Sequence, residues 1–255
     1  MEYSYVHPNA KTGRNVEIGP FSYIAADVEI GDDTWIGPHV TILDHVKIGS
    51  GCRIFPGAVI GAEPQDLKFK GEVTYVEIGN GTTIRECATI NRGTAASGKY
   101  ITRVGNNCLL MSYVHVAHDC SIADNCIISS YSGFAGEVTL EEYVVVGGGT
   151  LCHQFTTVGA HVMLGGALAV SKDVPPYILV GRPPVTFGGV NRVGLQRRGF
   201  TQDEIDEIHR IYMTIYKSGM NVSDACAKVR EEFPDSIHKN RILSFIEHSG
   251  RGIVK

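Results

Sequence analysis

The sequence predicts a left-handed parallel β-helix of hexapeptide repeats, a triangular prism, followed by a C-terminal α-helical domain. The main observation is an aliphatic residue at every sixth position over most of the first 170 residues. The phase runs unbroken through Ile18, Ile24, Ile30, Ile36, Ile42, Ile48, Ile54 and Ile60, returns at Ile78, Ile84 and Ile90, and resumes from Val104 to Val170. A period of six fits neither an amphipathic helix nor a simple strand, and it is typical of hexapeptide parallel β-helices.

A second register supports this fold. Two residues before each aliphatic position lies a small or β-branched residue, such as Ser22, Val28 and Thr34. Residues i and i−2 of a strand point to the same face, so both registers should face the interior. Glycine often follows the aliphatic residue, as at Gly19 and Gly31, where we expect it to supply the positive φ of a tight corner.

Each hexad is therefore expected to form one short strand and one corner, with three hexads closing a coil of 18 residues. Stacked coils repeat at about 4.8 Å, the ordinary strand spacing. Stacking buries a continuous aliphatic column that no single coil could bury alone. Each residue should consequently lie beside the one 18 positions later.

Composition excludes several classes of protein. The net charge is −4 without a basic block, which argues against a nucleic-acid binder. No stretch resembles a signal peptide or a transmembrane segment. The inward registers hold Cys52, Cys108, Cys120, Cys126 and Cys152, which we interpret as small core residues rather than disulfides or metal ligands. A cytoplasmic location is expected.

Two excursions interrupt the repeat, at about 61–77 and 91–103, and loops projecting from a stiff solenoid often carry function. We place the prism at 1–174 and the helical domain at 175–255, because the repeat ends at Pro175 and Pro176.

Four helices are expected after the prolines. A short one should cover Val190 to Arg198. Thr201 to Glu204 is a capping box that opens an amphipathic helix ending at Ser218–Gly219. The last two should run from about Ser223 to Phe233 and from about Asp235 to His248.

Polar side chains with catalytic potential gather in residues 114–122. The inward registers leave His115, His118 and Asp119 on the outside. The 18-residue rule brings Gly136 beside His118, Gln154 beside Gly136, and His153 beside Ala135. A histidine with a carboxylate neighbour is a common general base, and the N–H of a glycine can reach an oxyanion.

Other interpretations stay open at this point. Single exposed histidines are usually plain surface residues, and a β-helix can be a purely structural scaffold. Three histidines could also bind zinc, as in carbonic anhydrases of this repeat class. The helical domain would have no role in that case.

Six blocks carry a family resemblance: QDLKFKGE at 65–72, IRECATINRG at 84–93, LLMSYVHVAHDC at 109–120, HQFTTVGAHVMLGG at 153–166, DVPPY at 173–177 and GVNRVGLQRRGF at 189–200. The chain resembles the bacterial acyl-carrier-protein:UDP-N-acetylglucosamine O-acyltransferases, which begin lipid A synthesis. The resemblance spans essentially the whole chain.

The resemblance implies a catalytic set. His118 would be the general base that deprotonates the sugar 3-hydroxyl, Asp119 would support its imidazole, and the Gly136 N–H would be the oxyanion donor. No metal and no cofactor is implied, because the acyl donor is carried on the phosphopantetheine of acyl carrier protein.

The resemblance also implies binding residues and partners. Substrate contacts are expected at Asp66, Lys68, His115, His153 and Gln154, and nucleotide contacts at Asn191, Arg197 and Arg198. Gly166 matches the position that sets acyl length, where glycine implies a long 3-hydroxyacyl chain of about fourteen carbons or more. Acyl carrier protein and UDP-N-acetylglucosamine are the implied partners, and family members are homotrimers with sites between neighbouring prisms.

Some residues depart from the family pattern: Glu137 beside the oxyanion glycine, and Arg182, Pro184 and Val193 in the nucleotide-binding stretch, where more polar or histidine residues are common. Glu137 stands where the family usually has histidine, and the 18-residue rule places it beside Asp119, so a cation or a proton should separate the two carboxylates. The closest competing function is the related N-acyltransferase of lipid A synthesis. That enzyme typically carries a large extra N-terminal domain, whereas the hexads here begin by residue 18.

Overall fold

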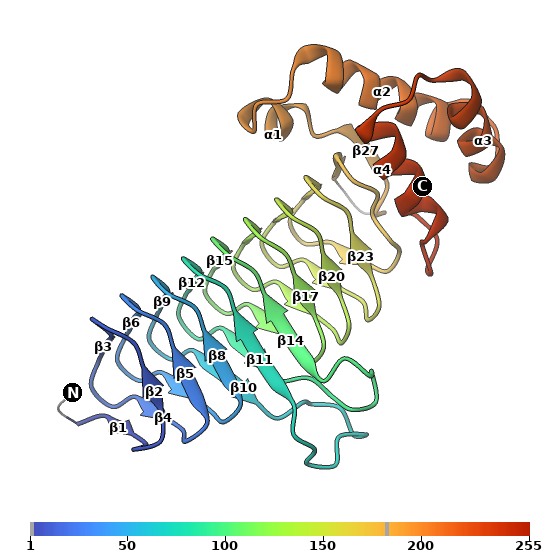
Figure 1. Ribbon diagram of the computed structural model, residues 1–255. Helices are drawn as coiled ribbons and strands as arrows, with labels where there is room; N and C mark the ends of the chain where they lie inside the picture. The colour runs from blue at the N-terminus through green and yellow to red at the C-terminus, as the bar shows by residue number, and fades with distance from the viewer. Residues whose placement is uncertain (1–2, 182–183) are drawn as a thin grey trace.

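A computed structural model describes residues 3–181 and 184–255 and consists of a three-sided prism capped at one end by helices (Figure 1). Arg182 lies outside the described residues. Sheet A contains β1 (Tyr5–Val6), β4 (Tyr23–Ile24), β7 (Thr41–Ile42), β10 (Val59–Ala62), β13 (Thr89–Asn91), β16 (His115–Val116), β19 (Gly133–Phe134), β22 (Leu151–Cys152) and β25 (Ala169–Val170). Sheet B contains β2 (Lys11–Thr12), β5 (Val28–Ile30), β8 (Val46–Ile48), β11 (Tyr75–Ile78), β14 (Ile101–Val104), β17 (Ser121–Ile122), β20 (Thr139–Leu140) and β23 (Thr157–Val158).

Sheet C contains β3 (Glu17–Ile18), β6 (Trp35–Ile36), β9 (Arg53–Ile54), β12 (Thr83–Ile84), β15 (Leu109–Leu110), β18 (Ile127–Ile128), β21 (Val145–Val146), β24 (Met163–Leu164), β26 (Ile178–Val180) and β27 (Phe187–Val190). From β1 to β25 the chain visits the three sheets in turn, so strands consecutive in sequence lie on different faces. All neighbouring strands pair in parallel except β26 and β27, which are antiparallel.

Both inward registers are buried as the sequence predicts. The aliphatic register forms one column, in which Ile24, Ile42 and Ile60 are fully buried, and the five inward cysteines lie beside it. Stacked strands pair at the expected offset of 18, as His115 with Gly133 and Gly133 with Leu151. The periodicity therefore fixes which side chains meet in the core.

The expected role of the glycines is wrong for most corners. The positive φ falls three residues after the aliphatic position, on Asp33, Asp119 and Glu137, while Gly19 and Gly31 have ordinary φ. A Cβ atom on Gly31 would lie 2.6 Å from Gly49 C and Ser50 N of the next coil. These glycines are required by the close approach of stacked backbones, not by a left-handed conformation.

Both excursions leave the prism at the same corner, between sheets A and B. The first is shorter than predicted and covers 63–74, and the second covers 92–100, because β10, β11, β13 and β14 extend into the predicted limits. Pairing steps by 30 residues across the first and by 26 across the second. The two loops project side by side from the prism (Figure 1).

The prism extends past the predicted boundary at residue 174. Pro175 and Pro176 occupy a corner, and β26 then pairs in parallel with β24, so the last parallel strand ends at Val180. A corner tolerates the prolines because it needs no ladder hydrogen bond from their nitrogens. The strand β27 was not expected.

The helical domain contains α1 (Arg192–Arg197), α2 (Gln202–Lys217), α3 (Val222–Glu232) and α4 (Ile237–Glu247). The Thr201–Glu204 capping box is present at α2, whose apolar face, with Ile205, Ile208 and Tyr212, is buried. Tyr212 donates a hydrogen bond to Pro176 O at 2.6 Å, which fastens this face to the end of the prism. Among the described residues, none of the helices is long and apolar enough to cross a membrane.

Candidate active site

A cavity of about 510 Å³ lies at the corner between sheets A and B, under the two projecting loops. Its wall combines residues of both loops with corner residues of three successive coils: Gln65, Asp66, Lys68, Thr94, Ala96, Ser97, His118, Gly136, Glu137, Gln154 and Phe155. Five of the predicted site residues therefore line one space: Asp66, Lys68, His118, Gly136 and Gln154.

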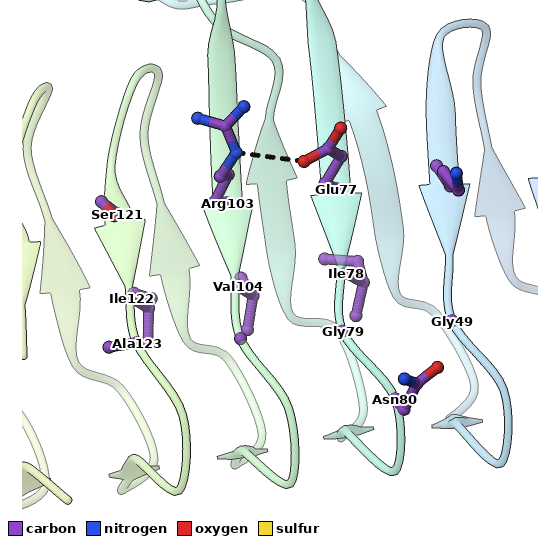
Figure 2. A pocket seen from close by; sticks show the side chains of 12 residues that line it. Gly49, Glu77, Ile78, Gly79, Asn80, Arg103, Val104, Ser121, Ile122 and Ala123 are labelled. Atoms are coloured by element: carbon purple, nitrogen blue, oxygen red, sulfur yellow. Dashed lines mark hydrogen bonds and ion pairs between the residues drawn. The ribbon is translucent and has the colours of Figure 1, made fainter. Parts of the chain in front are cut away.

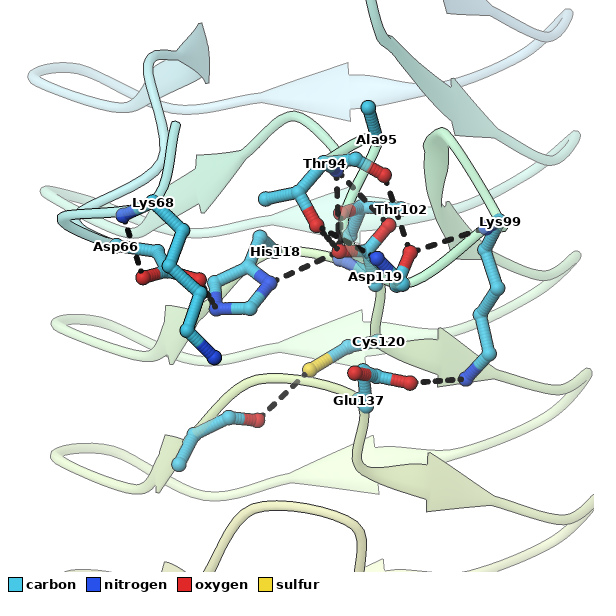
Figure 3. Close-up of polar contacts among 12 residues, drawn as sticks. Asp66, Lys68, Thr94, Ala95, Lys99, Thr102, His118, Asp119, Cys120 and Glu137 are labelled. Atoms are coloured by element: carbon cyan, nitrogen blue, oxygen red, sulfur yellow. Dashed lines mark hydrogen bonds and ion pairs between the residues drawn. The ribbon is translucent and has the colours of Figure 1, made fainter. Parts of the chain in front are cut away.

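His118 and Asp119 form the central pair of the site (Figure 3). The His118 Nδ1 atom lies 2.9 Å from Asp119 Oδ2, and the imidazole is 18% exposed. An ionised carboxylate only accepts hydrogen bonds, so Nδ1 must carry the hydrogen. The lone pair is left on Nε2, on the side of Asp66 Oδ2 at 3.9 Å.

Asp119 is completely buried and held by the second loop. Its two carboxylate oxygens accept the Thr94 N–H at 3.0 Å each, and Oδ2 also accepts the Thr94 hydroxyl at 2.7 Å. Burial by itself raises the pKa of Asp119, but the hydrogen bonds from His118 and Thr94 outweigh it and leave the pKa below its ordinary value. Asp119 is thus an anion at neutral pH.

The anion changes the basicity of its partner. The hydrogen bond to Asp119 raises the pKa of His118, burial opposes the change, and the charges of Asp119, Asp66 and Glu137 add to it. His118 is accordingly a stronger base than an ordinary histidine, with its basic nitrogen directed into the cavity.

Gly136 lies directly against the imidazole. A Cβ atom built on it would be 2.5 Å from His118 Nε2, so only glycine allows the histidine its position. Among the described residues no hydrogen-bond acceptor takes the Gly136 N–H. A free N–H next to a base is the arrangement that an oxyanion donor requires.

Glu137 is neutralised by a lysine that the sequence did not single out. Its Oε2 lies 3.6 Å from Lys99 Nζ of the second loop, as Figure 3 shows. The sequence called for a cation or a proton near the Glu137 and Asp119 carboxylates, and the cation that pairs with Glu137 comes from an excursion.

The other predicted site residues lie outside the cavity wall. The His115 Nδ1 atom is 2.7 Å from the Thr89 hydroxyl, and burial lowers the pKa of His115. His153 is exposed, with Nδ1 3.2 Å from Gln154 O. Gly166 is exposed at the corner between sheets C and A. The three histidines therefore share one region of the prism without converging on one point.

The predicted nucleotide contacts lie at the helical end. Asn191 is buried as the N-cap of α1, where it accepts the Gly194 N–H and donates to His161 O. The Arg198 guanidinium stacks over Tyr143 at 5.2 Å, and Arg197 is exposed. Tyr143 belongs to the corner between sheets B and C, so these residues do not reach the cavity of their own chain.

Sequence reasoning missed Thr94, Lys99 and Thr102, which contact Asp119 or Glu137 at the corner of the candidate site. Thr102 Oγ1 accepts the Asp119 N–H at 2.8 Å. The sequence does hold information on the position of the loops, because both insertions interrupt the same corner on the two coils that precede His118. Counting the hexads by corner would have placed the loops beside the histidine.

The described residues contain no cluster of three or more His, Cys, Asp or Glu side chains arranged to hold a metal ion. In this chain the Nδ1 of each of the three histidines faces a different protein oxygen.

The family described as UDP-N-acetylglucosamine O-acyltransferase, domain 2, matches residues 173–254, and bacterial transferase hexapeptide repeats match 27–62 and 101–136. The acyl-[acyl-carrier-protein]–UDP-N-acetylglucosamine O-acyltransferase of Janthinobacterium sp. is 44% identical over 98% of this chain and 97% of its own length. That of Thiobacillus denitrificans is 42% identical over 98% of this chain and 96% of its own length.

Solved structures agree over the full length. The UDP-N-acetylglucosamine acyltransferase of Bacteroides fragilis superposes with a TM-score of 0.98 at 50% identity, covering 100% of this chain and 99% of that chain. The Francisella novicida enzyme gives 0.96 at 38% identity, covering 100% and 93%. The predicted fold class, a left-handed parallel β-helix with a C-terminal helical domain, is confirmed. The chain belongs to the family of acyl-[acyl-carrier-protein]–UDP-N-acetylglucosamine O-acyltransferases.

Proposed function

We propose that this chain transfers a 3-hydroxyacyl group from acyl carrier protein to the 3-hydroxyl of UDP-N-acetylglucosamine, the first step of lipid A synthesis. The observation that supports it best is the pairing of a base with an oxyanion donor. The His118 Nε2 lone pair and the unpaired Gly136 N–H lie side by side on one cavity wall.

The mechanism follows from this geometry. His118 Nε2 removes the proton of the sugar hydroxyl while that oxygen attacks the thioester carbonyl. The Gly136 N–H donates to the resulting oxyanion, and collapse of the tetrahedral intermediate breaks the C–S bond and releases the thiolate. The thiolate takes the proton from the imidazolium and leaves as the thiol. General-base assistance contributes roughly 10²–10⁴-fold, and one oxyanion donor about 10²–10³-fold.

The remaining wall suits a sugar nucleotide. Asp66 and Gln154 offer acceptors and a donor for sugar hydroxyl and amide groups, and Lys68 offers a cation for phosphate. His115 and His153 flank this wall on sheet A and are proposed as further contacts to substrate.

We infer that Asn191, Arg197 and Arg198 act in the site of a neighbouring chain of a homotrimer. The outward row of sheet C at Leu109, Ile127, Val145, Met163 and Leu179 is apolar, and Ile127 is 39% exposed in the single chain. Such a row suits a face that packs against another copy.

Sheet B has the opposite character. A groove of about 490 Å³ crosses its strands, and Glu77 and Arg103 face each other there at 3.0 Å (Figure 2). The neighbouring coils continue this charge pairing between Lys11 and Glu29 at 2.7 Å. A face whose charges already pair within the chain is expected to remain in solvent.

Gly166 supports a long acyl chain. It is exposed, and the atom closest to a Cβ there would be Gly148 O at 3.1 Å, followed by Gly148 N at 3.7 Å, so a side chain could project outward from this position. We expect Gly166→Met to shift the preferred donor to a shorter chain without loss of the enzyme's fold. Competition between donors of different length measures the shift, and an unchanged preference would remove Gly166 as the length determinant.

We propose that the reaction needs no metal and no cofactor beyond the phosphopantetheine of the donor. An acyl-carrier-protein donor and seven free cysteines support a cytoplasmic location.

The decisive experiment supplies purified protein with UDP-N-acetylglucosamine and 3-hydroxyacyl-carrier protein, with and without chelator. Acyl transfer that resists chelation is expected, and His118→Ala should reduce it at least about 100-fold while the protein keeps its oligomeric state. Absence of transfer by the wild type would defeat the proposal. Loss of activity with chelator would favour a metal enzyme, and transfer only to a 3-O-acylated glucosamine would favour the related N-acyltransferase.

A further inference from the structure

One carboxylate joins the two loops that flank the site. Glu72, near the end of loop 63–74, accepts the Ala95 N–H of loop 92–100 at 3.0 Å through Oε1 and the Lys70 N–H of its own loop at 2.8 Å through Oε2. The hydrogen bond from Ala95, followed by that from Lys70, lowers the pKa of Glu72. Glu72 is therefore an anion with one oxygen on each loop.

The Ala95 amide that Glu72 holds is part of the Thr94–Ala95 peptide. Thr94 is the residue that satisfies Asp119, through its N–H and its hydroxyl (Figure 3). Fixing one side of this peptide restricts the position of Thr94 relative to the buried carboxylate. Glu72 is thus two residues removed from Asp119 and touches neither Asp119 nor His118.

The first loop also contacts the His118 imidazole, on the side opposite Asp119. Asp66 lies on the same loop as Glu72 and places Oδ2 3.9 Å from His118 Nε2. Its Oδ1 accepts the Lys68 N–H at 3.0 Å, so the local turn fixes the direction of the carboxylate. The contacts run from Glu72 through Thr94 and Asp119 to His118, and return through Asp66 to the loop that carries Glu72.

We propose that Glu72 is a positioning residue for acyl transfer. It clamps loop 63–74 to loop 92–100 and thereby sets Thr94 against Asp119 and Asp66 against His118. This inference deepens the proposed function and rests on it. The clamp positions residues on both sides of the His118 imidazole. Its loss should therefore lower kcat, because the base is less well positioned, and raise KM, because Asp66 is less well placed to contact the substrate.

A second contact between the loop regions provides a matched control. Glu63, at the start of the first loop, lies 3.4 Å from Arg92 at the start of the second, and its side chain is 70% exposed. This pair also joins the two loops through a carboxylate, but it does not hold the Thr94–Ala95 peptide. The Arg92 side chain is 13% exposed, but the Glu63 carboxylate lies in solvent, where an ion pair contributes little.

The test compares Glu72→Ala, Glu72→Gln, Glu63→Gln, Thr94→Val and the double variant Glu72→Ala/Thr94→Val in the full-length protein. We expect Glu72→Ala to lower kcat about tenfold or more, because small displacements of a catalytic group cost large factors. Glu72→Gln should fall between it and wild type, since an amide keeps one acceptor. Glu63→Gln should stay within about twofold.

The double variant separates positioning from general loop stability. If Glu72 acts through Thr94, the losses in kcat must be far less than multiplicative. Fully multiplicative losses, or a Glu72→Ala enzyme that behaves like Glu63→Gln, would overturn the proposal. Should Glu72→Ala fail to fold, Glu72→Gln carries the same comparison.

Amide hydrogen exchange provides a readout that needs no turnover. Glu72→Ala should accelerate exchange in the peptide covering 92–100, at Thr94 as well as at Ala95, whereas Glu63→Gln should not. Unchanged protection of Thr94 would overturn the clamp even in an active enzyme. A wild type without acyl transfer would instead defeat the proposed function, and the exchange result would still decide the role of Glu72 in ordering the loop.

Discussion

The basicity of His118 depends on charges that lie on three sides of one ring. Asp119 binds Nδ1, Asp66 faces Nε2, and Glu137 lies on the next coil with Lys99 in contact. A general base must be neutral, so acyl transfer is lost as the pH falls through the His118 pKa. Because that pKa is raised above the ordinary 6.5, the acidic limb of the rate profile should lie above 6.5.

Substitutions of Glu137 and of Lys99 should shift the His118 pKa in opposite directions, which tests the electrostatic role of this pair. Glu137→Gln removes a charge that raises the His118 pKa, so the acidic limb should move to lower pH. Lys99→Met leaves Glu137 unneutralised, so the limb should move to higher pH. The measurement is kcat/KM of the sugar nucleotide between pH 5 and 9.

Glu77→Gln is the matched control, because Glu77 is paired with Arg103 on sheet B, away from the cavity. It should leave the profile unchanged. A shift of both test variants in the same direction would contradict an electrostatic role for the pair.

The strands and corners show how far a sequence pattern reaches. The period of six predicted the strands, their register and the buried column, because burial forces each inward position to be apolar or small. The period did not predict the conformation of the corners. The positive φ of each corner falls on an outward-facing residue, and the pattern of buried positions does not specify which one. The contacts of Thr94 and Lys99 with the site could not be predicted for a related reason. Both residues lie in a loop outside the hexapeptide repeat, so the 18-residue rule does not say which residues they contact.

The stacking role of the corner glycines predicts a cost in stability. Gly31→Ala would place Cβ 2.6 Å from the backbone of the next coil, so two coils must separate locally. We expect a loss of about 1–3 kcal/mol in the free energy of unfolding, as for other overpacked interiors. Gly250→Ala is the control, since a Cβ there meets no atom within 4 Å. Equal denaturant midpoints for the two variants would show that the coils adapt freely.

At the scale of the whole molecule, one chain divides the site residues between two corners. The cavity with His118 lies between sheets A and B, whereas Arg198 lies against Tyr143 and His161 between sheets B and C. A continuous site of both groups requires two chains whose unlike corners meet. The apolar outward row of sheet C is consistent with such packing.

Mixing inactive chains tests this arrangement. If the base of one chain works with the arginine of its neighbour, His118→Ala and Arg198→Ala homotrimers are both impaired, and each mixed trimer contains one site with both native residues. Random mixing of equal amounts after joint unfolding and refolding should therefore restore about a quarter of wild-type activity. Mixing His118→Ala with Gly31→Ala/His118→Ala is the control and should restore none, because every chain lacks the base. If instead each chain supplied both groups to its own cavity, no mixture of the first pair could exceed the Arg198→Ala residual rate, and that result would exclude sites shared between neighbouring prisms.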